Sequence, residues 1–260
     1  ISTKVLINHG LTPQEIFFYR FLIAYIGIWV ISPKRLFTGN WKDELWLVAG
    51  GIFGGSLYFF TENTALGITQ ASNVSFIICT APLLTTILSL LFYKSEKASK
   101  GLIYGSLLAL MGVGLIVFNG SFVLKISPIG DWLTLLAALS WAFYSLIIKK
   151  MAGRYPTVFI TRKIFFYGVL TILPAFLLHP LQPDAAVLLQ PGVLFNLLFL
   201  AVLASLICYV LWNVVLKQLG TVRASNYIYL NPLVTMIASS LILDEKITLV
   251  ALGGAACIVC

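Results

Sequence analysis

Long runs with few or no charged residues recur along this chain, and each run is close to the length of a helix that crosses a membrane. A hydrocarbon core about 30 Å thick is spanned by roughly 20 apolar residues in an α-helix. Together with a short apolar piece that ends near Asn8, nine such runs predict ten spans. The runs cover residues 15–33, 45–64, 71–93, 101–119, 130–149, 160–179, 192–216, 222–243 and 247–260.

The composition agrees with lipid as the main solvent of the chain. Hydrophobic residues make up 60% of the sequence and charged residues only 10%, whereas an ordinary soluble domain is about 25% charged. A closed β-barrel would show alternating segments of about ten residues, and the sequence has none. We therefore expect an all-α polytopic membrane protein of about ten transmembrane helices, with the first and last helices incomplete in this chain.

Basic residues are distributed unequally between the two sets of predicted loops. Eleven lysines and arginines fall on one side and two on the other. Cytoplasmic loops carry an excess of these residues, so the basic side, and both termini, are expected in the cytoplasm of a protein in the inner (plasma) membrane. This asymmetry accounts for most of the net charge of +8 without a nucleic-acid partner. The eleven are Lys34, Arg35, Lys42, Lys94, Lys97, Lys100, Lys149, Lys150, Arg154, Lys217 and Arg223, and the two are Lys125 and Lys246.

An internal repeat relates the two halves of the chain. At an offset of 150 residues, the fourth span, ASNVSFIICTAPLLTTILSLLFYKSEK, matches the ninth, RASNYIYLNPLVTMIASSLILDEK. The offset aligns Pro82 with Pro232 and Asn63 with Asn213, and a weaker match earlier in the chain pairs Pro13 with Pro156.

The repeat predicts the topology of the two halves. Each unit holds five spans, and because five is odd the second copy enters the membrane inverted. We expect a first repeat over residues 1–120 and a second over 128–260. Inverted repeats are common in secondary transporters, although a passive channel could share the plan.

On these residues the chain resembles the EamA type of the drug/metabolite transporter superfamily. The resemblance rests on TAPLLTTILSLLFYKSE and LNPLVTMIASSLILDE, each with a proline within the helix and a following glutamate, and on FYRFLIA and LAALSWAFYSLIIKK. It implies ten helices, cytoplasmic termini, a central cavity between the halves, and transport, often export, of small metabolites. It does not identify the substrate.

Two ionisable residues within the spans are candidates for a transport site. A charged residue at the centre of a membrane costs roughly 2.5–3.5 kcal/mol, so it usually faces a cavity or a partner. Glu62, beside Asn63 at the outer rim of the expected cavity, could bind an amine or couple transport to protons. The alternative for Glu62 is a helix-end residue among lipid headgroups. Arg20 could clamp a substrate carboxylate bidentately, or else form an ion pair with Glu15 or extend to the outer surface.

Polar and aromatic residues on four later spans complete the candidate set. Pro82 and Pro232 remove backbone donors, and such helix breaks are tolerated in membranes where protein or a cavity satisfies the freed groups. The expected cavity-lining residues are Ser75, Asn226, Tyr229 and Asn231, with Trp141, Tyr144, Trp212 and Asn213 as further walls. The alternatives are helix–helix hydrogen bonding for the polar residues and ordinary packing for the aromatic ones.

Glycines and two basic residues have simpler interpretations. The segment AGGIFGGS pairs Gly50 with Gly54 and Gly51 with Gly55, which predicts close helix packing. Arg162 and Lys163 open the seventh span and are expected at the cytoplasmic interface.

The sequence favours a secondary transporter of a small-molecule substrate over the other function classes. An amino-acid-like or related amphipathic solute and export are expected. The four cysteines lack metal-ligand spacing and no GxxxxGK[ST] loop occurs, so neither a metal nor another cofactor is expected. An intramembrane enzyme is disfavoured because His9 and His179 fall in loops and HExxH is absent. A channel or a solute-sensing receptor stays as an alternative, and the oligomeric state is open.

Overall fold

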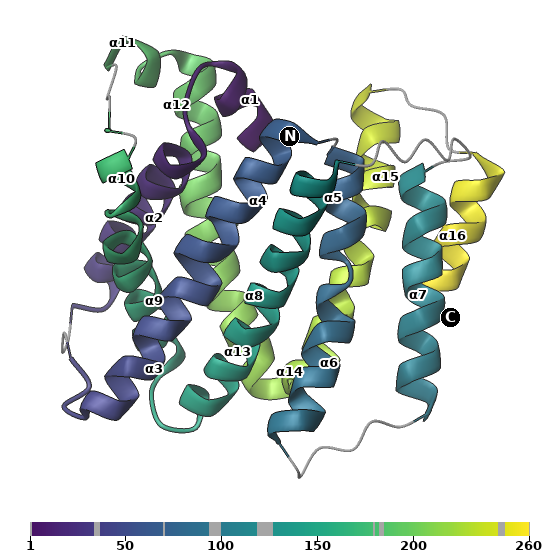
Figure 1. The fold of residues 1–260 in the computed structure, drawn as a ribbon, viewed down its shortest axis with the longest axis horizontal. Helices are drawn as coiled ribbons and strands as arrows, with labels where there is room; N and C mark the ends of the chain where they lie inside the picture. The colour runs from purple at the N-terminus through teal and green to yellow at the C-terminus, as the bar shows by residue number, and fades with distance from the viewer. Residues whose placement is uncertain are drawn as a thin grey trace.

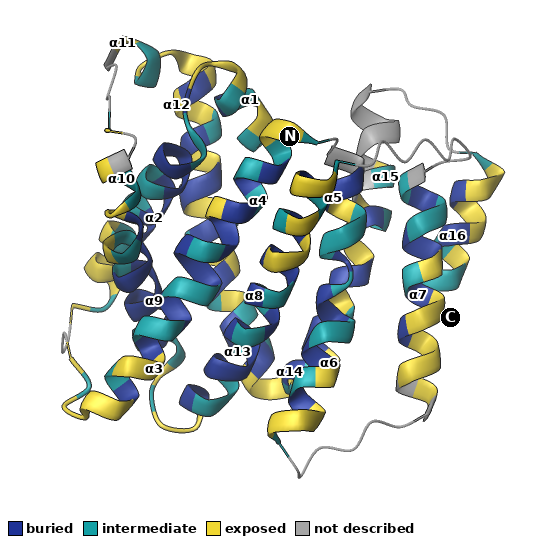
Figure 2. Ribbon diagram, viewed as in Figure 1, coloured by how far each residue is buried: buried dark blue, intermediate teal, exposed yellow. Residues whose placement is uncertain are grey.

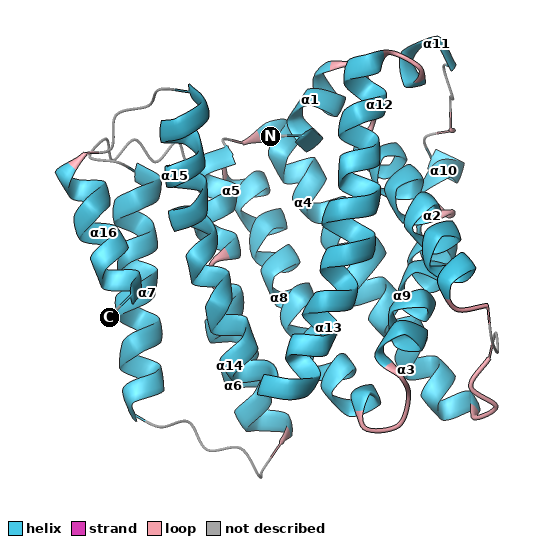
Figure 3. Cartoon of the chain, turned by 180° about the vertical axis from the view of Figure 1, so that it is seen from behind, coloured by secondary structure: helices cyan, strands magenta, loops and turns pink. Residues whose placement is uncertain are grey.

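The computed structural model describes residues 2–33, 37–69, 71–93, 100–118, 127–178, 180–181, 185–243 and 248–259, and all secondary structure within them is helical (Figure 3). Each of the nine charge-poor runs coincides with a helical stretch. Seven residues used in the sequence predictions lie outside the described ranges: Lys34, Arg35, Lys94, Lys97, Lys125, His179 and Lys246.

The elements follow one another along the chain with short connections. In the first half they are α1 (Ser2–Asn8), α2 (Pro13–Ile31), α3 (Trp41–Gly51), η1 (Ile52–Ser56), α4 (Leu57–Ile68), α5 (Ala71–Ile78), α6 (Ala81–Phe92) and α7 (Lys100–Phe118). In the second half they are α8 (Pro128–Ala152), α9 (Thr157–Ile172), α10 (Ala175–Leu178), α11 (Ala185–Leu188), α12 (Pro191–Leu198), η2 (Phe199–Ile207), α13 (Cys208–Leu219), α14 (Thr221–Asn226), η3 (Tyr227–Tyr229), α15 (Leu230–Leu243) and α16 (Leu249–Val259).

The long helices stand side by side, so their ends gather at two ends of the bundle (Figure 1). At the upper end of Figure 1, α2 and α8 begin and α4 ends. At the lower end, α3 and α9 begin and α13 ends. At one flank, α7 packs on α16.

Local sequence explains where the helices α2 and α3 begin. Thr12 and Glu15 form a capping box at the start of α2, in which the Thr12 amide donates to Glu15 Oε2 at 2.9 Å. Pro13 occupies the first turn, where its missing N–H costs nothing. At the start of α3, Asn40 Oδ1 accepts from the Lys42 amide at 3.0 Å.

Four long helical stretches contain interruptions. Two are π-helical segments, η1 between α3 and α4 and η2 between α12 and α13. The third separates α5 from α6 at Cys79 and Thr80, just before Pro82, and the fourth is the 3₁₀ turn η3, just before Pro232. Since Pro82 has no N–H, it cannot donate to the carbonyl four residues earlier, as a helical residue would. At this interruption the Thr80 amide and hydroxyl both donate to the Ile77 carbonyl, at 2.9 and 2.7 Å.

The main core lies where α2, α3, α4, α8, α9 and α13 meet, and the glycine segment allows these helices to approach closely. A Cβ atom added to Gly51 would lie 2.5 Å from Tyr167 Cβ and 2.9 Å from the Gly168 amide nitrogen on α9. The close packing expected from AGGIFGGS is therefore present between α3 and α9.

Gly51→Ala is expected to lower the free energy of unfolding by about 1–3 kcal/mol, the usual cost of overpacking. The backbone of α9 blocks the new methyl group, so α3 and α9 must separate. The measurement is unfolding of the purified protein in mild detergent. Gly67→Ala is the matched control, because nothing lies within 4 Å of its added Cβ. Equal stability of the two variants would contradict the packing argument.

The outer surface of the bundle is apolar over most helices. Five helical stretches are long and apolar enough to cross a membrane: Pro13–Ile31, Asn73–Phe92, Pro128–Ala152, Thr157–Leu177 and Pro191–Leu219. Large hydrophobic side chains on these stretches are exposed, such as Val30, Leu91 and Phe195, each at least 70% exposed. Exposed positions recur along the helices of the bundle (Figure 2). These features agree with the polytopic membrane protein expected from the sequence.

Candidate functional site

Arg20 and Glu62, the two ionisable candidates, lie near each other in the upper half of the bundle. Arg20 is only 5% exposed, and its Nε donates to Ser205 Oγ in η2 at 2.8 Å. Its guanidinium carbon lies 4.2 Å from the centroid of the Phe59 ring. The half-buried Glu62 is close enough for its charge to act on Arg20, and its Oε1 accepts from the Tyr58 hydroxyl at 3.2 Å. We call Arg20 and Glu62 the upper charged pair.

Asn63 lies beside the upper charged pair and links α4 to the start of α2. Its Nδ2 donates to the Pro13 carbonyl at 3.3 Å, and the residue is 1% exposed. Its Oδ1 is buried and has no hydrogen-bond partner among the described residues. A buried acceptor left in this way costs free energy unless a ligand or water satisfies it.

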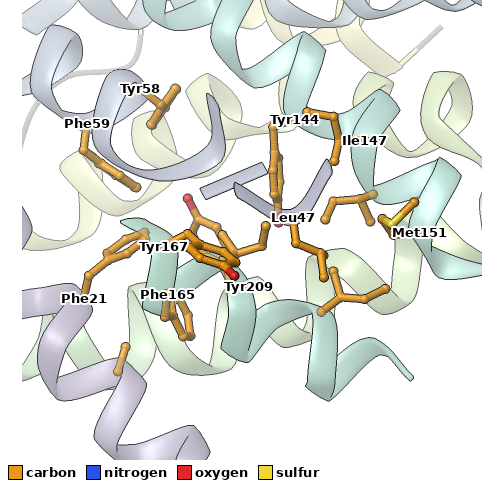
Figure 4. Close-up of a cluster of buried hydrophobic side chains, with 14 of the residues drawn as sticks. Phe21, Leu47, Tyr58, Phe59, Tyr144, Ile147, Met151, Phe165, Tyr167 and Tyr209 are labelled. Atoms are coloured by element: carbon orange, nitrogen blue, oxygen red, sulfur yellow. The ribbon is translucent and has the colours of Figure 1, made fainter. Parts of the chain in front are cut away.

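A central aromatic group lies below the upper charged pair and consists of Tyr58, Trp141, Tyr144, Tyr209 and Trp212. The Trp141 ring centroid lies 5.0–5.9 Å from those of the other four members. Tyr144 and Tyr209 point into the same space between the helices (Figure 4). Within the described part of the chain, the indole N–H groups of Trp141 and Trp212 have no acceptor. The group thus combines flat apolar surfaces with free donors.

Asn213 joins the central aromatic group to α9. The Tyr144 hydroxyl donates to Asn213 Oδ1 at 2.7 Å, and Asn213 Nδ2 donates to Thr161 Oγ1 at 2.9 Å. Asn63 and Asn213 therefore each contact the first turns of a long helix, α2 near the upper end and α9 near the lower end. The two asparagines that the repeat aligns occupy opposite ends of the core.

Tyr144→Phe is expected to lower the free energy of unfolding by about 1–3 kcal/mol, because it leaves the buried Asn213 Oδ1 without its donor. Unfolding in mild detergent measures the change. Tyr227→Phe serves as the control, since Tyr227 is 57% exposed and should shift stability by at most about 0.5 kcal/mol. If the Tyr144 variant were as stable as the Tyr227 variant, the hydrogen bond would contribute nothing.

The remaining candidates on the fourth and ninth spans are spread around the two interruptions. Tyr229 is 3% exposed and lies in η3, while Asn226 just before it is partly buried, with an Oδ1 that has no partner among the described residues. Ser75 and Asn231 are exposed. Tyr229 and Asn226 thus lie at or beside η3 and are at least partly buried, whereas Ser75 and Asn231 are exposed.

At the lower end, one ion pair is buried. The Lys163 ammonium contacts the Glu44 carboxylate, with side chains 1% and 17% exposed. Glu44 also accepts hydrogen bonds from the Tyr167 hydroxyl and from the Thr38 amide, the latter at 2.9 Å. Arg162, beside Lys163, is 1% exposed and donates to the Ser32 carbonyl. The expectation of interface positions for Arg162 and Lys163 was incomplete, because both side chains are packed inside the protein.

A second ion pair lies next to the first and joins an exposed arginine to a buried carboxylate, that of Asp43, whose side chain is 6% exposed. Arg154 Nη1 lies 2.5 Å from Asp43 Oδ1, and the Arg154 side chain is 53% exposed. The Tyr155 hydroxyl donates to Asp43 Oδ2 at 2.8 Å. Burial, and then this hydrogen bond to a carboxylate, raise the pKa of Tyr155 above its usual value, which keeps it a donor. We call Asp43, Glu44, Arg154 and Lys163 the lower ion-pair network, and it joins α3 to α9 and the preceding loop.

Several members of this arrangement were missed in the sequence. In the sequence, Tyr58, Phe59 and Tyr209 resemble ordinary packing aromatics. Only the internal repeat sets Phe59 and Tyr209 apart. The offset of 150 that aligns Asn63 with Asn213 also aligns Phe59 with Tyr209, and the two ring centroids lie 6.4 Å apart. Among the described residues, no cluster of three His, Cys, Asp or Glu side chains could hold a metal ion.

Comparison with known proteins identifies the family. A family model described as the EamA-like transporter family matches residues 1–118 and 128–260. The chain belongs to this family. The resemblance drawn from the two proline-containing segments is therefore confirmed, and the protein is a multi-pass membrane transporter of the drug/metabolite type.

Relatives of this EamA-like chain carry transporter names. An "Uncharacterized transporter" of Archaeoglobus fulgidus is 30% identical over 91% of this chain and 81% of its own length. A "Probable amino-acid metabolite efflux pump" of Escherichia coli is 23% identical over 92% of this chain and 81% of its own. A Salmonella typhimurium protein of the same description is 26% identical over 95% and 83%. The family and these relatives are named as transporters rather than enzymes.

One crystal structure of a protein supports the fold of this EamA-like chain. It covers 99% of this chain and 88% of its own, with a TM-score of 0.76 and 18% sequence identity. At that identity the likeness concerns the fold alone.

Proposed function

We propose that this chain is a secondary transporter of the inner membrane that exports small, amino-acid-like or related amphipathic metabolites by alternating access. The observation that carries the proposal is the buried Arg20 close to the half-buried Glu62, beside an aromatic group with free indole donors. Such residues within membrane helices are costly and usually mark a substrate or ion path. The names of the Escherichia coli and Salmonella relatives support the solute class and the direction.

The chemistry of the upper charged pair fits a zwitterionic solute. Arg20 offers a guanidinium that binds a carboxylate through paired hydrogen bonds. Glu62 offers a carboxylate for an amine, or a carboxyl that takes up a proton and couples export to the proton gradient. The central aromatic group supplies apolar surface for the rest of an amphipathic solute. The substrate then displaces Arg20 and Glu62 from their partners Ser205 and Tyr58.

We propose further that the two halves are inverted repeats of five helices, residues 1–120 and 128–260. Support comes from interruptions at equivalent places: η1 and η2 in the third and eighth spans, and the breaks before Pro82 and Pro232 in the fourth and ninth. The contacts of Asn63 and Asn213 at opposite ends of the core agree with inversion. In this proposal the lower end of the bundle, which carries most of the basic residues, faces the cytoplasm. A unit of ten complete spans would begin and end on that side.

Alternating access would use equivalent cations at the two ends. Arg20 follows Pro13 by seven residues, and Lys163 follows Pro156 by the same number. Arg20 lies near enough to Glu62 in the upper half for their charges to act on each other, and Lys163 forms a direct ion pair with Glu44 at the lower end. In our proposal, each basic residue closes its own end through a carboxylate of the rod formed by α3, η1 and α4. Opening one end breaks one of these pairs while the other persists.

The proposal is tested by profiling metabolites in the medium of bacteria that express the full protein. We expect one or a few zwitterionic solutes to accumulate outside cells with the wild type and not with Arg20→Gln at matched abundance. Arg223→Gln, which changes an exposed arginine of α14 at the lower end, should export like the wild type. Equal accumulation in all strains would argue against export through the upper charged pair. Single-channel current across bilayers would indicate a channel instead.

A further inference from the structure

A groove lies on the outer face of α3 at the lower end of the bundle. Its volume is about 440 Å³, and its lining residues are Trp41, Lys42, Leu45, Trp46 and Ala49. Trp41, Leu45 and Ala49 are each four positions apart, and Lys42 and Trp46 are the same distance apart beside them, so all five lie on one face of the helix. Trp41 is 69% exposed and Leu45 56%, so the groove opens away from the protein core.

Two ammonium groups border this apolar groove. Lys42 is part of the lining, and Lys150 of α8 has its Nζ 3.7 Å from the centroid of the Trp46 ring. Neither lysine has a carboxylate partner among the described residues. The nearest acids along α3 are already engaged, Asp43 with Arg154 and Glu44 with Lys163. Within the described part of the chain, the groove therefore presents two cations that no carboxylate balances.

We propose that this groove binds an anionic phospholipid, with the headgroup phosphate between Lys42 and Lys150 and an acyl chain along Leu45, Trp46 and Ala49. The residues from 41 to 49 span about 12 Å of helix, enough to lead from the headgroup region into the hydrocarbon. Tryptophans at such a boundary are typical of membrane interfaces, and a nearby lysine attracts an anionic lipid by about 1 kcal/mol. The assignment to the cytoplasmic leaflet rests on the proposed orientation, whereas the binding itself does not.

A lipid fits this groove better than a second copy of the chain. Each copy carries a net charge of +8, and a dimer across this face would bring Lys42 and Lys150 toward the same lysines or other basic loops. An anionic lipid instead supplies the missing negative charge and covers the exposed rings of Trp41 and Trp46.

Quenching of tryptophan fluorescence by brominated lipids tests the proposal. The full protein is placed in phosphatidylcholine vesicles that contain a small fraction of acyl-brominated phosphatidylglycerol, or the same fraction of acyl-brominated phosphatidylcholine. We expect the glycerol lipid to quench at a lower fraction. In each preparation the brominated lipid is present in both leaflets, so the result does not depend on orientation or on transport activity.

Variants locate the binding and keep the test decisive. Lys42→Gln combined with Lys150→Gln should weaken the preference for phosphatidylglycerol by more than tenfold. The reason is that each lysine contributes about 1 kcal/mol, or roughly fivefold, to the attraction of an anionic lipid. Lys217→Gln, a change of another exposed lower-end lysine, should leave it unchanged. Trp41→Phe combined with Trp46→Phe should remove the preferential quenching.

Three outcomes would overturn the proposal. Equal quenching of the wild type by both lipids would mean ordinary contact with surrounding lipid. An unchanged preference after loss of both lysines, or of both tryptophans, would put the anionic lipid elsewhere. Absence of quenching, together with disulfide-linked dimers of Leu45→Cys, would mean that a second copy covers the groove.

Discussion

Glu62→Gln is expected to reduce export driven by a proton gradient at least about tenfold while leaving the fold intact. Glutamine keeps an oxygen that accepts from the Tyr58 hydroxyl, so local packing is preserved. It cannot exchange a proton, and it removes the negative charge that acts on Arg20. Hydrogen bonds to charged groups contribute about 1.5–3 kcal/mol, which corresponds to about a ten- to hundredfold change in rate if lost in the transition state.

Transport in proteoliposomes separates the two roles of Glu62. The purified protein would be supplied with the solute found by metabolite profiling, under a pH gradient and, separately, under solute exchange without a gradient. If Glu62→Gln loses transport under the pH gradient but keeps solute exchange, Glu62 acts in proton coupling. If the variant loses both activities, Glu62 acts in binding the amine of the solute. Glu15→Gln is the control. Glu15 is a glutamate like Glu62, but it lies in the first turn of α2, where its side chain belongs to the capping box. If Glu62→Gln transported the solute at the wild-type rate under the pH gradient, Glu62 would have no role in the mechanism.

Lys163→Met is expected to destabilise the closed lower end by about 3–5 kcal/mol, the usual cost of removing one partner of a buried ion pair. The Lys163 side chain is 1% exposed and the Glu44 side chain 17%, so water cannot easily replace the lost ammonium. Arg154→Gln removes a cation from the neighbouring pair. The Arg154 side chain is 53% exposed and the buried Asp43 keeps the hydrogen bond from the Tyr155 hydroxyl, so that change should cost less, about 1–2 kcal/mol.

Unfolding in mild detergent and labelling of introduced cysteines measure these effects. Lys163→Met should lower stability and increase thiol labelling of a cysteine placed at Thr161, which is buried near the lower end of α9. Adding Glu44→Gln to Lys163→Met should restore part of the stability, because no unpaired charge is left. A Lys163→Met protein as stable as Arg154→Gln would mean that the pair does not hold the lower end closed.

Hydrophobic run length predicted the all-helical, polytopic fold well, because it follows from the membrane as solvent. The charge-poor runs coincide with helical stretches, and AGGIFGGS marks a close helix contact. Runs of this kind carry no signal for π-helical turns, which depend on how neighbouring helices pack. The structure was needed to find η1 and η2 and the partition of the fourth span at Thr80.

The candidate site was predictable only where a residue was unusual for its surroundings. Arg20 and Glu62 stand out as charges in apolar runs, and the structure brings them together. Lys163 and Glu44 lie 119 positions apart near span ends, where charges are ordinary, so nothing in the sequence pairs them. Tyr58 and Tyr209 look like any aromatic residues of a membrane helix until their neighbours are known.

The π-helical segment η1 sets how far Glu62 is rotated from Glu44 about the axis of the rod formed by α3, η1 and α4. Glu44 and Glu62 lie in a continuous helix, on either side of Ile52–Ser56. A π-helical turn accommodates more residues than an α-helical turn, and each residue turns an α-helix by about 100°. Conversion of η1 to regular α-helix would therefore rotate Glu62 about the rod axis relative to Glu44. In the alternating-access cycle that we propose, this rotation would turn one carboxylate away from its cation while the other keeps its contact.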